Sequence, residues 1–105
     1  VALRDGRPAL VTGSGGSNRI RSALVQIIAR HLSNGEKLEE ATSAPRIHLE
    51  GDALHAEPGL NSKELAGPWE VKSWDEQNVF FGGAHSVTSG EAAGDARRGG
   101  SAIIF

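Results

Sequence analysis

A glycine-rich turn is the feature of this sequence best suited to chemistry. Residues 13–20 read Gly-Ser-Gly-Gly-Ser-Asn-Arg-Ile and stand between a short apolar run and a segment with helical periodicity. A helix that opens in this way leaves several backbone N–H groups unpaired at one point, where the helix dipole adds partial positive charge. Such a point can bind an anion or stabilise an oxyanion. Spacing by itself favours a plain tight turn, so the rest of the sequence must decide.

The turn does not match the phosphate-binding loops of nucleotide enzymes. A Walker loop needs Lys followed by Ser or Thr after its last glycine, and this turn has neither arrangement. A dinucleotide-binding turn that starts at Gly13 needs Gly or Ala at position 18, where Asn18 stands. The strand before the turn is also expected to belong to a hairpin rather than to a β-α-β unit. A nucleotide site is therefore not predicted.

Other groups that could do chemistry give weaker signals. The histidines, His31, His48, His55 and His85, show no metal-ligand spacing, although His48 and His55 could face each other across a hairpin. The sequence has no cysteine, and Ser14 lies one residue away from a Gly-x-Ser-x-Gly pattern. We therefore expect no activated nucleophile, metal site or cofactor among these residues.

A charged segment near the C-terminal end allows two interpretations. Residues 95–100 read Asp-Ala-Arg-Arg-Gly-Gly. They could form an exposed turn with a local ion pair that contributes at most ~1 kcal/mol. Alternatively, an arginine of this segment could be buried and hold the last strand. Spacing does not separate the two interpretations.

Composition restricts the class of protein. The 105 residues carry 11 Lys and Arg against 13 Asp and Glu, for a net charge of −2, so nothing would attract nucleic acid or an anionic membrane. No apolar run approaches the roughly 18 residues of a membrane span, so no direct membrane contact is expected. The length suits a single domain, 1–105, with one core. Because the sequence has no methionine and begins in a strand-like run, we expect it to be a segment of a longer protein.

Hydrophobic periodicity predicts an α+β fold. Strands are expected at 1–4, 7–12, 46–50, 53–57, 79–81, 85–88 and 101–105. The first two form a hairpin about Asp5-Gly6 and the next two form a second hairpin, whereas 58–78 is ambiguous. Helices over about 19–33 and 37–43 would then cover one face of an antiparallel sheet.

The first helix has the strongest pattern. Apolar residues recur at i, i+3, i+4, i+7 and i+8 from Ile20, and Val25 widens the stripe, so we expect a mostly buried helix. Ser17 or Asn18 is a suitable N-cap. The apolar run 101–105 suits a buried strand.

Several stretches, taken in order, resemble the C-terminal part of the gamma-glutamyltranspeptidase family. The turn 13–20 is similar to the family's Gly-Ser-Pro-Gly-Gly-Ser-Arg-Ile, and 38–48 is similar to the run that ends in Ala-Pro-Arg-Ile-His. The segments 81–87 and 94–100 resemble the family's closing strands and C-terminus. The resemblance covers nearly the whole chain except 58–78, where this sequence is shorter than usual.

The resemblance implies an N-terminal-nucleophile hydrolase, an αββα sandwich formed by autocleavage into a large and a small subunit. The nucleophile of the family is a threonine at the new N-terminus of the small subunit, and residues 1–105 would be the C-terminal part of that subunit. The implied reaction transfers a γ-glutamyl group from a glutathione-like amide to water or an amine through an acyl-threonine intermediate. The implied partners are the remainder of the parent chain and a γ-glutamyl small molecule. Family members are commonly exported, which implies a periplasmic or extracellular location.

The resemblance also carries over the donors of an oxyanion hole. Matching by glycines assigns Gly15 and Gly16, whereas matching without a gap assigns Gly16 and Ser17, because the family's proline is absent after Ser14. Gly16 belongs to both alignments. Ser14 is the residue implied for substrate binding, and no metal site is implied.

Two other hypotheses compete with this one. A noncatalytic or differently specific relative, such as an acylase or a capsule amidase, would account for the missing proline and the short 58–78 segment. A stand-alone binding module is the other, but one layer of helices cannot cover both faces of a sheet. An isolated chain is therefore expected to expose an apolar sheet face and to self-associate.

Overall fold

The computed structural model describes all 105 residues. Its strands are β1 (Ala2–Arg4), β2 (Arg7–Gly15), β3 (Ile47–Glu50), β4 (Ala53–Ala56), β5 (Glu70–Ser73), β6 (Gly83–Val87) and β7 (Ala92–Ala93). Its helices are α1 (Arg19–Ile28), which continues as the π-helical turn η1 (Ala29–Ser33), α2 (Leu38–Ser43), and the 3₁₀ turns η2 (Val79–Phe81) and η3 (Ala96–Arg98).

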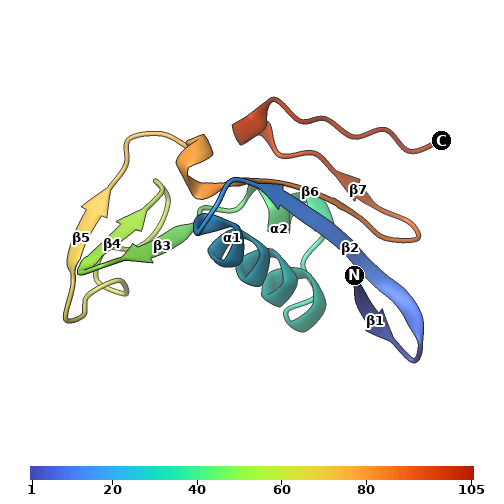
Figure 1. Cartoon of the computed structure of the whole chain (residues 1–105), viewed down its shortest axis with the longest axis horizontal. Helices are drawn as coiled ribbons and strands as arrows, with labels where there is room; N and C mark the ends of the chain where they lie inside the picture. Colours follow the sequence, from blue (N-terminus) through green and yellow to red (C-terminus); the bar gives the residue numbers. More distant parts are fainter.

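The main sheet has four antiparallel strands in the order β1-β2-β6-β7. Figure 1 shows α1 and α2 on one side of β2 and β6 and the C-terminal segment on the other. On the helix side, Leu10 of β2 is buried against Leu38 of α2, and Ile28 and Leu32 pack around them. The predicted α+β arrangement, with two helices on one face of an antiparallel sheet, is confirmed.

The first hairpin forms where the sequence predicted it. Asp5 and Gly6 have φ values of 52° and 75°, which is the pair of left-handed residues that a type I′ turn needs. The second strand, however, does not end at residue 12. It continues to Gly15, because β6 pairs with it along its whole second half, up to the opposed residues Gly15 and Gly83.

The second predicted hairpin is part of a separate three-stranded sheet, β3-β4-β5. His48 and His55 are direct partners across the antiparallel pair β3 and β4, as the sequence suggested. The strand β5 comes from the ambiguous region and lies parallel to β4. Its four residues, Glu70–Ser73, are mostly exposed and carry no clear alternation, so no strand could be predicted there from the residue pattern.

Helix α1 is less buried than predicted. Only Ala23 and Ile27 are fully buried, whereas 62% of Val25 is exposed. Val25 is two residues from Ile27, and a separation of about 200° places it on the opposite side of the helix. Asn18 occupies the N-cap position, but its side chain makes no capping hydrogen bond.

Two predicted strands are wrong. The segment 79–81 forms a 3₁₀ turn, because the Asn78 side chain accepts a hydrogen bond from Phe80 N at 2.8 Å and curls the chain at that point. The segment 101–105 is exposed and forms no strand, with Phe105 entirely in solvent. Its neighbour β7 spans only two residues and offers no long edge for pairing.

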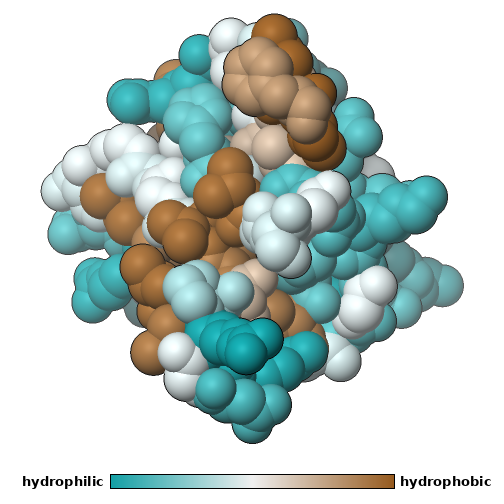
Figure 2. Space-filling view, turned by 90° about the vertical axis from the view of Figure 1, so that its right-hand side faces the viewer, coloured by the Kyte–Doolittle hydropathy of each residue, from teal (hydrophilic) through white to brown (hydrophobic).

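The face of the main sheet opposite the helices is partly apolar. Val11 and Val87 are partners on β2 and β6 and are 42% and 47% exposed, and Leu3 of β1 is 64% exposed. Figure 2, which views the molecule from the right-hand side of Figure 1, shows apolar residues gathered in a band across the surface. This observation matches the expected exposed sheet face. None of the helices has the length and apolar character that crossing a membrane requires.

Candidate active site

The glycine turn joins the end of β2 to the start of α1. Gly16 has a φ of 131°, which L-residues rarely adopt, so the turn requires glycine at this position. The hydrogen bonds outside helices and strands include none donated by the N–H groups of Gly16, Ser17 or Asn18, while the Ser17 carbonyl accepts from Ile20 N at 3.1 Å. The turn therefore presents free backbone donors at the N-terminus of a ten-residue helix.

A cavity lies beside this turn. Its lining residues are glycines of the turn, the glycine that follows η2, and aromatic, cationic and other side chains. They are Gly15, Gly16, Arg19, Trp74, Asn78, Val79, Phe80, Gly82 and Arg98. The cavity has two guanidinium groups and no carboxylate among its lining residues. Its electrostatic character therefore suits an anion or a developing negative charge.

Arg98 crosses the sheet at the paired glycines. A Cβ placed on Gly83 would lie 2.3 Å from Cγ and Cδ of Arg98, and one on Gly15 would lie 2.0 Å from Arg98 Nη1. The side chain therefore runs along Gly83 and ends over Gly15, next to the turn. Glycine at both positions leaves the space that Arg98 occupies.

Arg19, in the first turn of α1, also lines the cavity. Its guanidinium lies 4.2 Å from the centre of the Phe80 ring, a cation–π geometry, and 3.8 Å from Glu50 Oε2. Phe80 in turn stacks on Trp74 with ring centres 4.8 Å apart. The Trp74 indole N–H donates to His55 Nδ1 at 3.1 Å. These contacts fix the aromatic wall of the cavity.

Ser14, predicted to bind substrate, does not line this cavity. Its hydroxyl donates to the Gly15 carbonyl and accepts a hydrogen bond from Gly83 N, each at 3.2 Å. A Cβ on Gly82 would come within 2.9 Å of the same hydroxyl oxygen. In this chain, Ser14 therefore holds β2 against β6.

A network of buried charged residues packs near the site. Arg46 is 2% exposed, and it donates to Asp95 Oδ2 at 2.7 Å, to the Thr42 carbonyl at 2.9 Å and to the Phe81 carbonyl at 3.1 Å. Asp95 Oδ2 also accepts from Ala84 N at 2.9 Å. The network thus joins α2, β6 and the segment before η3.

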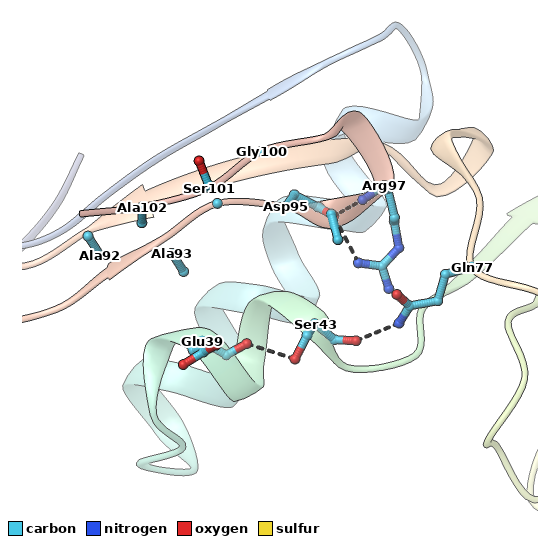
Figure 3. Close-up of a pocket in the computed structure, with 12 residues that line it drawn as sticks. Glu39, Ser43, Gln77, Ala92, Ala93, Asp95, Arg97, Gly100, Ser101 and Ala102 are labelled. Atoms are coloured by element: carbon cyan, nitrogen blue, oxygen red, sulfur yellow. Dashed lines mark hydrogen bonds and ion pairs between the residues drawn. The ribbon is translucent and has the colours of Figure 1, made fainter.

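Arg97 completes this network from the other side, and Figure 3 shows it beside Asp95 in a pocket under the C-terminal segment. It donates to Asp95 Oδ1 at 3.2 Å and to both carboxylate oxygens of Glu57. Glu57 also accepts from Arg46 N at 2.9 Å. Of the two interpretations of residues 95–100, the buried arginine is confirmed, although no last strand follows it.

The two arginines and two carboxylates compensate each other's charge. Burial alone would raise the pKa of Asp95, but the Ala84 N–H and the charge of Arg46 outweigh it and lower that pKa. Burial lowers the pKa of Arg46, and Arg97 adds to this effect. Burial by itself would also lower the pKa of Arg97, but the hydrogen bonds and the charge interaction with Glu57 raise it. The buried roles of Arg46 and Glu57 were not predicted, because their charged partners Asp95 and Arg97 lie 49 and 40 residues away.

The histidine pair in the second sheet forms no metal site. His48 Nδ1 lies 2.8 Å from Ser22 Oγ, and its Nε2 is buried without a partner. Burial lowers the pKa of His48, while Glu50 opposes the shift. No group of three His, Cys, Asp or Glu residues could hold a metal ion.

The fold and the site together define a class of protein. Solved structures with this fold are N-terminal-nucleophile hydrolases. The model of the gamma-glutamyltranspeptidase family matches residues 1–105, and the chain belongs to this family.

Particular relatives agree with this assignment. The glutathione hydrolase proenzyme of Escherichia coli is 36% identical over 67 residues, which are 62% of this chain and 12% of that protein. Gamma-glutamyltranspeptidase from Pseudomonas nitroreducens, complexed with L-DON, superimposes with a TM-score of 0.81 at 24% identity and covers 100% of this chain. The transpeptidase enzyme CapD of Bacillus anthracis gives 0.76 at 26% identity over 91% of this chain. The chain spans 60% and 63% of these two solved chains, respectively.

Proposed function

We propose that this chain is part of an enzyme that moves a γ-glutamyl group from a glutathione-like amide to water or an amine. In this proposal a threonine outside the chain is the nucleophile, and an acyl-threonine forms and then breaks down. The chain alone is inactive, and its partner is the remainder of the parent protein. The substrate class follows from the family and from the relative named as a glutathione hydrolase.

One observation carries the proposal. The N–H groups of Gly16 and Ser17 make no hydrogen bond at the N-terminus of α1, and Gly16 borders a cavity that contains Arg19 and Arg98. When the nucleophile attacks a γ-carbonyl, negative charge develops on the carbonyl oxygen. Donors already oriented toward that oxygen stabilise the transition state without reorganisation. We assign Gly16 as one donor and either Gly15 or Ser17 as the second.

Two variants at position 17 distinguish the two alignments in the full parent protein. Ser17→Ala removes the hydroxyl and keeps the N–H, whereas Ser17→Pro removes the N–H. If Ser17 is a donor, Ser17→Pro lowers kcat by about 10²–10³ while Ser17→Ala keeps most activity. If Gly15 is the donor, both variants retain activity. Thermal unfolding of each variant checks that Pro leaves the fold intact, and equal large losses in both would contradict a backbone role.

The second candidate function is the same chemistry on another amide. The departure from the family's motif motivates it, since the proline expected after Ser14 is absent and the segment 58–78 is short. Ser14 remains a predicted substrate-binding residue, although its hydroxyl is engaged by the backbone of Gly15 and Gly83. A panel of γ-glutamyl and non-glutamyl amides, given to the parent protein, separates the candidates by their relative kcat/KM.

A further inference from the structure

The cavity beside the glycine turn contains groups that an oxyanion hole does not need. We propose that it binds the carboxylate at the far end of the leaving group, with Arg98 as the principal contact and Arg19 as a second positive charge. The leaving group would then be a short peptide or amino acid with a free C-terminus. This inference rests on the proposed function and adds a feature of the substrate at the same site.

The guanidinium of Arg98 is available to a ligand. Its neighbour Arg97 donates hydrogen bonds to Glu57, to Asp95 and to two backbone carbonyls, so its guanidinium is already engaged. Arg98 is exposed and takes part in none of the ion pairs of the chain, and its backbone N–H alone donates, to the Asp95 carbonyl at 3.1 Å. A guanidinium matches a carboxylate in geometry and binds it through two parallel hydrogen bonds.

Arg98 is also held in place before any ligand arrives. Its stem follows Gly83 and its head covers Gly15, as the contacts of a Cβ at either glycine show. An arginine that is free in solvent would lose much of its rotamer freedom on binding, whereas one laid along a strand pair loses less. The same contacts place the charged head next to the turn, within reach of a short group attached to the reacting carbonyl.

The rest of the cavity fits a small anionic peptide rather than a naked anion. Phe80 and Trp74 stack on each other and line the same cavity as Arg98, and Arg19 packs over Phe80. The only acid near Arg19 is Glu50, at 3.8 Å and with both side chains at least one third exposed, so this pair is weak. The cavity thus keeps a net positive charge beside a surface for apolar contact.

A matched pair of substrates tests the assignment in the full parent protein. Glutathione and its C-terminal amide share the γ-glutamyl bond and differ in the charge at the far end. We expect a preference for the acid in kcat/KM of about tenfold or more, the usual size of a charge-assisted hydrogen bond. Arg98→Gln should reduce the preference at least to one third of its value, and Arg98→Lys should keep part of it. Arg21→Gln, at an exposed arginine of α1 that pairs with no acid, is the control and should keep the full preference. An unchanged preference in Arg98→Gln overturns the inference.

A binding measurement separates this inference from the proposed function. If the unmodified parent turns over neither substrate, the proposed γ-glutamyl activity fails, and titration calorimetry with glycylglycine and glycylglycine amide tests the cavity directly. Tighter binding of the acid, with the difference lost in Arg98→Gln but kept in Arg21→Gln, supports the carboxylate site. Equal affinity for the two dipeptides, or a difference that survives in Arg98→Gln, contradicts it.

Discussion

Arg97 and Glu57 are separated by 40 residues, yet they form a buried two-point ion pair in which Arg97 Nε donates to Glu57 Oε2 at 2.9 Å. Both side chains are at most 1% exposed. The pair connects η3 to the end of the β3–β4 hairpin, so it links the two sheets of the chain. Glu57 Oε2 also accepts from Asn78 N, which positions the segment before Phe80 and the cavity wall.

Removing one partner of this network should be costly. Glu57→Gln leaves the charge of Arg97 only partly compensated in a buried place, and a loss of about 3–5 kcal/mol in the free energy of unfolding is expected. Denaturant unfolding of the parent protein measures it. Glu40→Gln, at an exposed position on α2, is the control, and it should change stability by less than about 0.5 kcal/mol. Similar small effects of both variants would contradict the structural role of the pair.

The contact between Arg98 and the paired glycines predicts a coupling between positions 83 and 98. Gly83→Ala places a methyl group where the Arg98 stem lies, and it should destabilise the protein by about 1–3 kcal/mol. Because the nearest atoms all belong to Arg98, Arg98→Ala should remove most of that penalty. A double-mutant cycle on thermal unfolding gives the interaction energy. Strict additivity of the two changes would show that Arg98 does not lie over Gly83.

His48 should make stability depend on pH. Burial lowers its pKa in the folded state, so the unfolded chain binds a proton more readily between the ordinary value of about 6.5 and the lower folded value. Stability therefore falls as pH drops from about 7 toward 5. Glu50 opposes the shift, and Arg19, His55 and Arg21 add to it.

Substitution isolates the contribution of His48. In His48→Gln the midpoint of thermal unfolding should change less between pH 7 and pH 5 than in the unmodified protein. A steeper dependence in His48→Gln would mean that another group controls stability in this range.

The exposed sheet face predicts how the isolated chain behaves. Val11 and Val87 lie side by side on the face that no helix covers, so the isolated chain should self-associate. The double variant Val11→Lys, Val87→Glu should shift it toward monomer in sedimentation velocity. Val25→Lys, at a more exposed valine on α1, serves as the control and should have little effect. A monomeric unmodified chain with a cooperative melt would favour the stand-alone module.

Local sequence patterns predicted the elements whose structure depends on neighbouring residues alone. Asp5-Gly6 needs positive φ at both residues, and the periodicity from Ile20 gave the long helix. Two predictions failed for different reasons. Strand β5 forms because β4, a distant partner, offers it an edge, whereas 79–81 curls because of a local signal that the prediction missed, the cap by Asn78. Segment 101–105 has strand composition but no adjacent strand of sufficient length in this chain.

The candidate site also has a part that the sequence pattern predicted and a part that depends on residues far apart in the chain. The glycine turn was visible from spacing, and its free donors follow from any helix that begins without side-chain caps. The cavity was not visible, since Arg98 and Phe80 meet it from segments more than 60 residues beyond Gly16. The buried arginine of 95–100 could only be identified once Glu57 and Thr42 were found around it.

The most direct test of the central claim is the release of a chromogenic amine from a γ-glutamyl anilide, measured for the full parent protein and for residues 1–105 side by side. We predict activity in the parent and none in the isolated chain, because in the proposed reaction the chain supplies the oxyanion donors and the nucleophile lies outside it. Activity in the isolated chain would contradict the divided site. A parent protein without activity on any γ-glutamyl amide would contradict the proposed reaction. It would indicate that an enzyme of this fold acts on another substrate.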